Sequence, residues 1–382
     1  MQGYDLPLEL KMLQTTVKRF VRDEVLPLEV GMDPEAVDIS PADWERLASK
    51  ARSAGLWCLG VAKEHGGGGL GVFGQCVVSE ETAQHRNGLY NPAYSTMGRP
   101  PPPVIFSGSP AQVRRYGVPA VRDAIKTFYA ITEPGGGSDP ANAVQTRAVR
   151  RDGRWVLNGT KIFISGAHEA QWGVLFARTG GPGHGGISCF IMETAYPGFK
   201  VRPVPVIRPW YPNEIVLEDC PVPPENLLGE ENRGFDLVAG LLGYLRFPYS
   251  AANVGVAVAA LRMAVQRAKE RVTFGQPLAQ RQAIQWMLAD SEIEIRAARW
   301  LTWDGAWKAD RGEDYRQEAS IAKVFSSEVL GHVVDRAIQV HGGYGVSKEL
   351  PLERWYREAR VRRLGEGPSE VHRMVIARNL LR

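Results

Sequence analysis

The stretch YAITEPGGGSD, residues 129–139, decides how the chain is organised. It begins as a short run of apolar and β-branched residues, which predicts a strand that ends at Thr132. Three consecutive glycines follow at positions 135–137, and glycine lets the backbone approach a bound group closely. Backbone N–H groups in such a turn are suited to holding a pyrophosphate. Taken alone, a glycine-rich segment between strands is also the composition of an ordinary turn.

The sequence pattern differs on the two sides of this stretch. Before it, apolar residues such as Leu10 and Val17 recur at helical spacing, and Ser40 before Pro41 is a favourable helix start. From about residue 127 to 230, short β-branched and aromatic runs alternate with turn residues, which predicts a small antiparallel barrel or sandwich. From about residue 234, helical spacing returns over long segments and predicts a bundle of three or four helices.

The bulk composition narrows the classes of partner. The 382 residues carry a net charge of +4, from 46 basic and 42 acidic side chains, so no strong field attracts nucleic acid or a membrane surface. The four cysteines lie far apart in the sequence, at positions 58, 76, 189 and 220 (Cys58, Cys76, Cys189 and Cys220). This spacing favours free thiols over a disulfide framework or a metal site. No apolar run is long enough to span a bilayer, and the first residues lack the pattern of a signal peptide. We therefore expect a cytoplasmic protein that binds no metal, inserts into no membrane and binds no nucleic acid.

Six stretches, in order along the chain, resemble landmarks of the acyl-CoA dehydrogenase family. YAITEPGGGSD resembles its flavin-binding signature, and the other five are NGTKIFISGA (158–167), PPENLLGEENRGF (223–235), RVTFGQPLAQRQAIQ (271–285), QVHGGYGV (339–346) and RLGEGPSEVHR (363–373). The resemblance implies an α+β, acyl-CoA dehydrogenase-like fold. We expect an N-terminal helical domain at 1–126, a middle antiparallel β-barrel at 127–235 and a C-terminal four-helix bundle at 236–382. The resemblance also implies that the protein assembles as a homotetramer or homodimer.

The same resemblance implies bound FAD and assigns residues to it. Thr132 would hydrogen-bond the flavin ring, Ser138 would lie near the pyrophosphate and the bound thioester, and Arg271 would reach the FAD of a neighbouring subunit. The implied cofactor-binding residues are Tyr129, Thr132, Gly137, Ser138, Phe163, Ser165, Arg271, Phe274, Gln282, Gln339, Gly342 and Gly343. The family usually has Trp and Thr where this chain has Phe163 and Ser165. For Arg271, a solvated charge at a helix end remains the alternative.

The stretch RLGEGPSEVHR supplies the expected catalytic residue. Desaturation of an acyl thioester needs a carboxylate that removes the α-proton in a site kept dry, and the resemblance assigns this role to Glu366. The family's other base position is occupied here by Leu245, which cannot accept a proton. The implied substrate-binding residues are Ser138, Arg246, Gly365 and Gly367. The alternative is that Glu366 is a structural partner of Arg362 or Arg363.

Three departures from the family pattern concern the acyl group. Gly365 stands where many relatives carry a bulky aromatic residue, Pro368 replaces the usual threonine, and IRPWYPNE (207–214) replaces a more polar loop. Because the first departure removes side-chain volume beside the base, we expect a bulky, branched or otherwise unusual acyl-CoA substrate. Electron-transfer flavoprotein or a similar protein is the expected electron acceptor.

Other activities on the same fold remain open. Relatives act as oxidases, reductases or desulfinases, although retention of Glu366 favours dehydrogenation. One branch of the family consists of DNA-binding alkylation-response flavoproteins, and the arginines at 354, 357, 360, 362 and 363 raise that possibility for this chain. Proteins of that kind are expected to carry a basic extension, which is not found before Arg382.

Overall fold

The computed structural model describes residues 6–382, apart from the side chains of residues 239–242 within one helix. The chain forms two compact units. The first comprises the residues up to Leu56 together with Leu70–Met97 and Gly243–Arg382, and the second comprises Trp57–Gly69 and Gly98–Leu242. The order helix, β, helix along the chain is confirmed, whereas the domain boundaries at 126 and 235 remain a prediction.

The first unit is built from helices. Their bounds are α1 (Leu8–Phe20), α2 (Leu26–Glu29), α3 (Pro41–Ser53), α4 (Val72–Thr82), α9 (Gln282–Asp310), α10 (Arg316–His341), α11 (Leu352–Arg362), α12 (Ser369–Leu380) and most of α8 (Gly234–Glu270). A short hairpin, β9 (Val272–Thr273) with β10 (Gln276–Pro277), joins α8 to α9. As predicted, Ser40 begins α3, and its hydroxyl accepts a hydrogen bond from the Asp43 backbone N–H at 3.1 Å.

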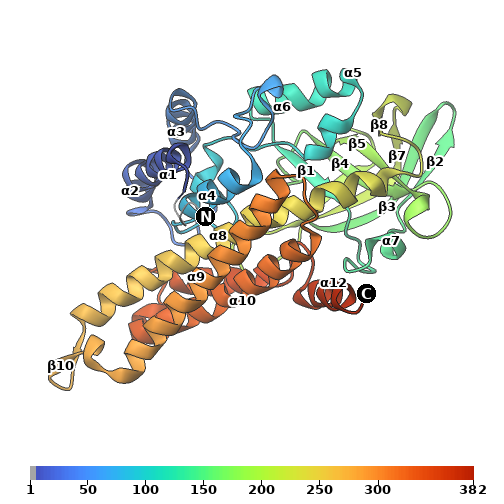
Figure 1. Cartoon of the computed structure of the whole chain (residues 1–382). Coiled ribbons are helices and arrows are strands. Elements are labelled where there is room, and N and C mark those ends of the chain that lie inside the picture. Colours follow the sequence, from blue (N-terminus) through green and yellow to red (C-terminus); the bar gives the residue numbers. More distant parts are fainter. Residues whose placement is uncertain (1–5) are drawn as a thin grey trace. The chain divides into compact units, whose positions relative to one another are not determined.

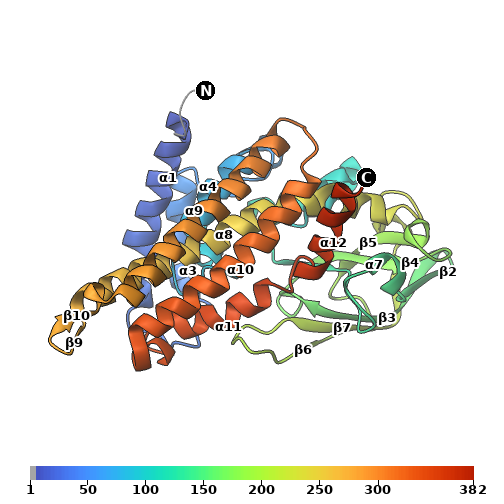
Figure 2. The same ribbon diagram turned by 60° about the horizontal axis from the view of Figure 1, so that its bottom comes forward.

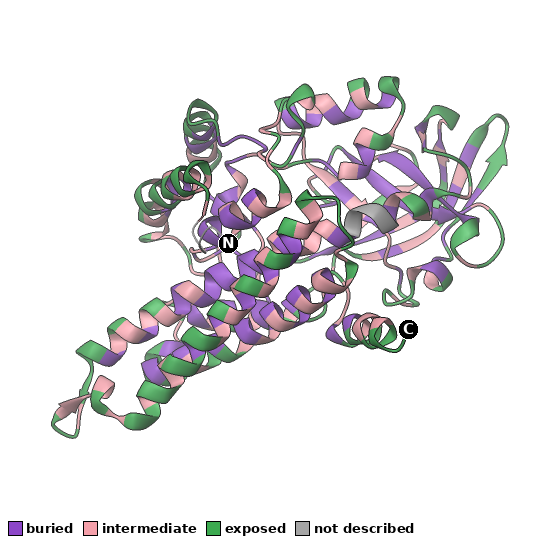
Figure 3. Cartoon of the chain, in the orientation of Figure 1, coloured by how far each residue is buried: buried purple, intermediate pink, exposed green. Residues whose placement is uncertain are grey.

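The long helices α8, α9 and α10 run side by side in both views (Figures 1 and 2). Small buried residues of α8, including Ala257, Ala260 and Ala264, belong to the same hydrophobic cluster as Val333 and Ala337 of α10. Alanine at these positions lets helices approach closely, and buried and exposed residues alternate along the helices as an amphipathic pattern requires (Figure 3). This packing forms the predicted bundle.

The second unit contains the sheet. Its strands are β1 (Thr127–Ala130), β2 (Arg147–Arg151), β3 (Arg154–Ile164), β4 (Trp172–Arg178), β5 (Ile187–Glu193), β6 (Phe199–Pro203), β7 (Asn213–Val222) and β8 (Leu227–Leu228). The hydrogen-bonded order is β6-β7-β3-β2-β4-β5-β8, with β1 beside β4. The unit also holds the short helices α5 (Pro110–Gln112), α6 (Val118–Arg122) and α7 (Pro140–Ala143).

The sheet differs in two details from the sequence-based expectation. It is mixed rather than wholly antiparallel, because β1 pairs in parallel with β4, with Thr127 opposite Trp172 and Ala130 opposite Leu175. The first strand also ends at Ala130 rather than at Thr132, which frees Thr132 for a turn. Every residue of β4 is buried, so β4 is a central strand whose continuous apolar run carries no alternation from which a pairing direction could be read.

A buried ion pair fixes the turn after β1. The Lys161 ammonium on β3 lies 2.7 Å from the Glu133 carboxylate, and their side chains are 0% and 5% exposed. Glu133 also accepts hydrogen bonds from the backbone N–H groups of Gln145 and Thr146, at 2.7 and 2.9 Å. Burial lowers the pKa of Lys161 to about 8, and the charge of Glu133 opposes this shift. The pair therefore joins three separate segments of the second unit.

Replacing Lys161 by Met should destabilise the second unit strongly. The change leaves the buried Glu133 carboxylate without its counter-charge, and breaking a buried pair in this way costs about 3–5 kcal/mol. Chemical denaturation measures the loss, and Lys161→Met combined with Glu133→Gln should recover part of it. Equal stabilities of the single variant and wild type would show that the pair does not hold the turn.

Candidate functional site

The second unit carries the residues assigned to the flavin ring in and around the glycine turn, residues 133–138. A Cβ atom placed on Gly137 would lie 3.0 Å from Thr132 Cγ2, so the side chain of Thr132 and the backbone of Gly137 are in contact. The Ile162 N–H donates to the Thr132 carbonyl at 2.9 Å, which ties the start of the turn to β3. Ser138 is exposed. The anchored turn thus presents Thr132, Gly137 and Ser138 together.

Phe163 lies next to this turn in a strained conformation. Its φ is +59°, and the register of the β3–β7 pairing shifts between Lys161 and Ile164. Such a bulge turns a side chain out of the strand's alternation, and the Phe163 ring is 56% exposed. Ser165, which follows the strand, is also exposed. By contrast, Tyr129 is half-buried and packs on Phe176 in the core, with ring centroids 5.3 Å apart.

In the first unit, Glu366 occupies the base loop, residues 363–369, which joins α11 to α12 and includes the first residue of α12. Glu366 itself has a φ of +57°, and Gly367 has a φ of +92°. A left-handed conformation is costly for a residue with a Cβ atom, so the loop needs outside support. Contrary to the expectation of a dry base, the Glu366 side chain is exposed in the single chain. The left-handed turn directs it away from the core on which the loop rests.

Support comes from α10 and α12. The Lys323 ammonium of α10 donates to the carbonyls of Gly367 and Arg363, at 2.5 and 3.3 Å. The His372 ring of α12 donates from Nε2 to the Glu366 carbonyl at 3.0 Å. Three of the loop's carbonyl groups are therefore bonded to side chains of buried residues.

The charges around the base loop are mostly positive. Burial, followed by the charges of Arg362 and Arg246, lowers the pKa of Lys323 to about 8, although Glu366 opposes the shift. Burial also lowers the pKa of Arg246, again opposed by Glu366. Burial and then Arg246 lower the pKa of His372 to about 4, so this ring is neutral near pH 7. The Glu366 side chain therefore lies among cationic groups, of which Lys323 and Arg362 are buried.

Glu366 is not paired with Arg362 or Arg363, the two arginines that would be its partners if its role were structural. Arg362 is buried and donates to the side chain of Asn253 at 2.7 Å and to the carbonyls of Tyr249 and Leu89 at 2.6 and 3.1 Å. Arg363 lies 3.9 Å from Glu328. Among the described residues, Glu366 forms no ion pair. The Arg246 Nε atom is buried without a hydrogen-bond partner.

The space beside Gly365 is not simply vacant. A Cβ atom on Gly365 would lie 3.1 Å from the hydroxyl of Tyr249, which comes from α8. That hydroxyl donates to the Arg362 carbonyl at 3.2 Å, and the Arg362 guanidinium lies 3.2 Å from the Tyr249 ring centroid. An aromatic ring thus approaches the base loop from a helix, and glycine at 365 leaves room for it.

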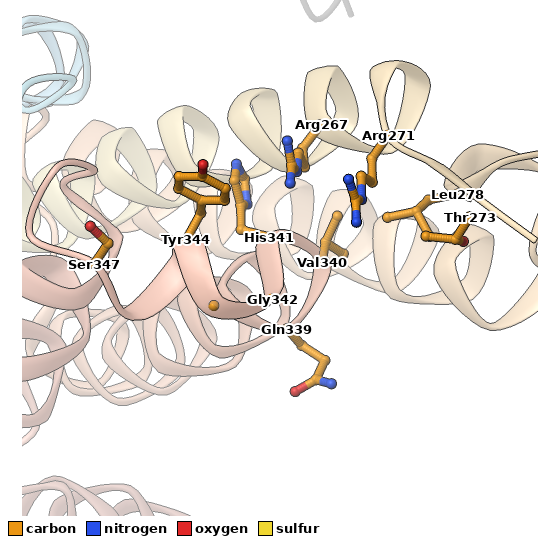
Figure 4. A pocket seen from close by; sticks show the side chains of 11 residues that line it. Arg267, Arg271, Thr273, Leu278, Gln339, Val340, His341, Gly342, Tyr344 and Ser347 are labelled. Atoms are coloured by element: carbon orange, nitrogen blue, oxygen red, sulfur yellow. The ribbon is translucent and has the colours of Figure 1, made fainter.

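A cavity of about 580 Å³ lies between α8 and the end of α10. It is lined by Arg267, Arg271, Thr273, Leu278, Gln339, Val340, His341, Gly342, Gly343, Tyr344 and Ser347. Figure 4 shows the side chains of Arg267, on α8, and of Arg271, the residue that follows α8, extending toward the α10 end. Neither guanidinium pairs with a carboxylate of the described chain, and the Arg267 Nε atom is buried without a hydrogen-bond partner. The two cations and the open backbone at Gly342 and Gly343 fit a phosphate-bearing group, as the FAD assignment requires.

Of the six predicted cofactor residues in the first unit, two lie outside this cavity lining. Phe274 occupies the tip of the β9–β10 hairpin with a φ of +49°, and its ring is 97% exposed. Gln282, at the start of α9, is exposed as well. The sequence-based assignment missed Arg267 and Tyr344, although Arg267 lies one helical turn before Arg271, whose backbone N–H donates to the Arg267 carbonyl at 2.9 Å.

Residues 6–382 offer neither a metal site nor a helical membrane span. No group of three or more His, Cys, Asp or Glu side chains there could hold a metal ion. In the same part of the chain, no helix combines the length and apolar character needed to cross a membrane. In the described chain none of the four cysteines forms a disulfide bond, and all four are buried.

Comparison with known proteins covers nearly the whole chain. Residues 7–123, 129–220 and 232–381 match the N-terminal, middle and C-terminal domains of acyl-CoA dehydrogenase. The chain is 35% identical to acryloyl-CoA reductase (NADH) of Anaerotignum propionicum, covering 99% of this chain and 96% of the relative. It is 35% identical to (R)-benzylsuccinyl-CoA dehydrogenase of Thauera aromatica, covering 99% and 97%. The structure of butyryl-CoA dehydrogenase from Megasphaera elsdenii superposes with a TM-score of 0.87 at 30% identity, covering 100% of both chains.

These matches extend over all three domains, and their identities are 30% to 35% over nearly the full length. The helical N- and C-terminal domains and the middle β domain are the architecture that the six sequence landmarks predict. The chain belongs to the acyl-CoA dehydrogenase family of FAD-dependent oxidoreductases.

Proposed function

We propose that this protein dehydrogenates an acyl-CoA thioester between its α- and β-carbons, with Glu366 as the base that removes the α-proton. The observation that carries the proposal is the state of Glu366. It is an exposed carboxylate without an ion-pair partner in the described chain, held in a left-handed turn by buried side chains. A carboxylate that only stabilised the fold would be paired, as Glu133 is.

Three residues of the loop and two neighbouring cations have a part in this proposal. Glu366 takes the α-proton, and the glycines at 365 and 367 let the thioester approach the loop backbone. Arg246 and Lys323 surround the loop with positive charge, which favours the negative charge that develops on the substrate. Bound FAD supplies the acceptor for the β-hydride. The single chain leaves Glu366 exposed, so bound flavin and thioester are needed to exclude water from it.

The cofactor is proposed to contact two sets of residues. Thr132, Gly137, Ser138, Phe163 and Ser165 form the set for the flavin ring, while Tyr129 supports them from the core. Arg271, Gln339, Gly342 and Gly343, with Phe274 and Gln282 nearby, form the set for the adenine half of an FAD from a neighbouring subunit. The cavity at Arg271 supports the second assignment because it is lined by two unpaired guanidinium groups.

Assembly of several copies is supported by one face of α9. Large apolar side chains are exposed there every seven residues: Trp286, Ile293, Trp300 and Trp307. Residues seven apart lie along nearly one line of a helix, so they form a continuous apolar stripe. Contiguous exposed apolar surface of this kind marks an interface. We infer a homotetramer or homodimer in which this stripe is covered by another copy.

The proposed substrate is a bulky or branched acyl-CoA, and the proposed acceptor is electron-transfer flavoprotein or a similar protein. The relative from Thauera aromatica is named as a dehydrogenase of benzylsuccinyl-CoA, whose acyl group is branched and aromatic. In this chain the Tyr249 side chain lies close to the base loop, and it fits there because residue 365 has no side chain.

Reduction of an α,β-unsaturated acyl-CoA is the second candidate, because the acryloyl-CoA reductase is as similar to this chain as the dehydrogenase. Screening the FAD-loaded protein against CoA esters under anaerobic conditions distinguishes the dehydrogenase from the reductase. Saturated CoA esters should bleach the oxidised flavin of a dehydrogenase. The reduced flavin of a reductase would instead be reoxidised preferentially by enoyl-CoA esters.

The arginines of α11 give little support to DNA binding, because Arg354 pairs with Glu358 and Arg357 with Glu353.

Glu366→Gln should preserve the fold, bound FAD and thioester binding while flavin reduction by substrate falls steeply. The amide keeps the size of the side chain but cannot accept the proton, and general-base catalysis contributes about 10²–10⁴-fold. Stopped-flow bleaching under anaerobic conditions measures the rate. Leu245→Glu in the Glu366→Gln background places a carboxylate at the family's other base position and should recover part of it. If Glu366→Gln is reduced as fast as wild type, the base lies elsewhere.

Arg271→Ala should weaken FAD binding and, with it, assembly. A hydrogen bond to a charged group contributes about 1.5–3 kcal/mol, so the Kd for FAD should rise roughly ten- to hundred-fold. Titration of the apoprotein, followed by flavin fluorescence, gives the Kd, and analytical ultracentrifugation gives the oligomeric state. Arg22→Ala is the matched control, since Arg22 is an exposed arginine paired with Asp23. An unchanged Kd would make Arg271 a solvated charge.

Gly365→Tyr should slow reduction by the preferred bulky substrate more than reduction by short linear acyl-CoAs. The new ring must compete with Tyr249 for space, and overpacking of this kind costs about 1–3 kcal/mol. Adding Tyr249→Ala should relieve the collision and restore activity with short substrates first. Equal losses on every chain length would show that volume at this position does not select the acyl group.

A further inference from the structure

Lys323 is an unusual residue in the bundle. Its side chain is 0% exposed, yet the ammonium forms no ion pair with a carboxylate in the part of the chain that the structure describes. Its hydrogen bonds go instead to the carbonyls of Gly367 and Arg363 in the base loop. Burying an ammonium without a paired carboxylate is costly, so a lysine whose contacts are backbone carbonyls calls for a role beyond stability.

His372 acts on the same loop from the other side. It is 1% exposed, and its Nε2–H donates to the Glu366 carbonyl while Nδ1 lies 3.2 Å from the Ser320 hydroxyl. Because the ring is neutral near pH 7, the carbonyl contact fixes the tautomer with the proton on Nε2. A Cβ atom on Gly367 would lie 3.0 Å from this ring nitrogen, so loop and ring are closely packed.

The three bonded carbonyls lie on both sides of the Glu366 Cα atom. The Arg363 carbonyl precedes it, and the Glu366 and Gly367 carbonyls follow it. Fixing these peptide groups fixes the direction in which the Glu366 side chain leaves the loop. A left-handed glutamate is uphill in energy, so the loop would relax to another conformation without such bonds.

We propose that Lys323 and His372 are positioning residues, which clamp the base loop so that Glu366 points at the substrate's α-carbon. This proposal rests on the proposed function of Glu366 as the base. Neither residue needs to touch the substrate, because each acts through the loop backbone.

Lys323 has two opposing effects on the rate of proton abstraction. Whether the rate rises or falls when the ammonium is removed therefore shows which effect is larger. A nearby cation weakens a carboxylate as a base, so removing the ammonium for electrostatic reasons alone would speed proton abstraction. Releasing the loop would slow it, since a displacement of about 1 Å costs roughly 10²-fold in rate. The clamp predicts that the second effect wins.

The clamp also predicts a pH dependence. Lys323 faces Arg246 of α8, Arg362 of α11, Glu370 and His372 of α12, and Glu366 itself. With a pKa of about 8, Lys323 loses its proton just above neutrality, and a neutral amine is a weaker donor than an ammonium. The rate of flavin reduction should therefore fall as the pH rises through about 8.

The test uses the FAD-loaded protein with Lys323→Met, Lys323→Gln and, as matched control, Lys200→Met, which removes an exposed lysine of β6. Lys323→Met should bind substrate with a Kd within about threefold of wild type but reduce its flavin about 10–100-fold more slowly. Its rate should lack the decline near pH 8, and Lys323→Gln, which keeps a donor, should lie between. Hydrogen exchange should rise in residues 363–369 and stay unchanged in β6. The control should match wild type.

His372→Gln, which keeps a donor, should be milder than His372→Leu, which has none. A Lys323→Met protein that is reduced as fast as wild type or faster, or with unchanged exchange in residues 363–369, overturns the clamp. Retention of the decline near pH 8 in that variant also overturns it. Failure of the proposed function looks different: wild type would then not be bleached by any CoA ester, or Glu366→Gln would be as fast as wild type, whereas the exchange measurement still reports whether the loop is clamped.

Discussion

Two buried ammonium groups, one in each compact unit, hold backbone segments that carry candidate site residues. Lys161 holds the glycine turn through Glu133, and Lys323 holds the base loop through its carbonyls. Both are fully buried, and burial lowers the pKa of each to about 8. Each stands next to a residue with a Cβ atom in a left-handed conformation, Phe163 or Glu366. The strained residue thus lies close to a backbone segment that a buried lysine holds, through Ile131 and Glu133 in one unit and through Arg363 and Gly367 in the other.

The sequence predicts the fold well because its signals are local. Long helical spacing after residue 234 and β-branched runs between 127 and 230 correspond to α8–α10 and to β3, β4, β5 and β7. The parallel pairing of β1 with β4 could not be predicted, since both strands are apolar runs and pairing direction depends on residues about 45 positions apart. Short strands such as β6 and β8 carry too few residues for a pattern.

The candidate site residues also fall into a group that the sequence predicts and a group that it does not. Glu366, Thr132 and Arg271 lie in recognisable motifs, so the sequence alone singles them out. The residues that support them do not: Lys323 precedes the Gly367 carbonyl by 44 positions, and Tyr249 meets Gly365 across more than a hundred. Such partners are brought together only by helix packing, and buried lysines resemble surface lysines in a sequence. Gly365 illustrates the limit, because its small size indicates free volume until the Tyr249 hydroxyl is placed beside it.

The apolar stripe on α9 has a consequence for how the protein is made. A newly folded single chain exposes Trp286, Ile293, Trp300 and Trp307 along one helix, and such a surface adheres to other unfolded or unassembled chains. If another copy covers the stripe and shares in cofactor binding, each copy is stabilised by mass action, in proportion to the supply of chains and of flavin. A cell short of riboflavin would then lose this protein first by aggregation and degradation of unassembled chains, before any loss of catalytic competence in the assembled ones.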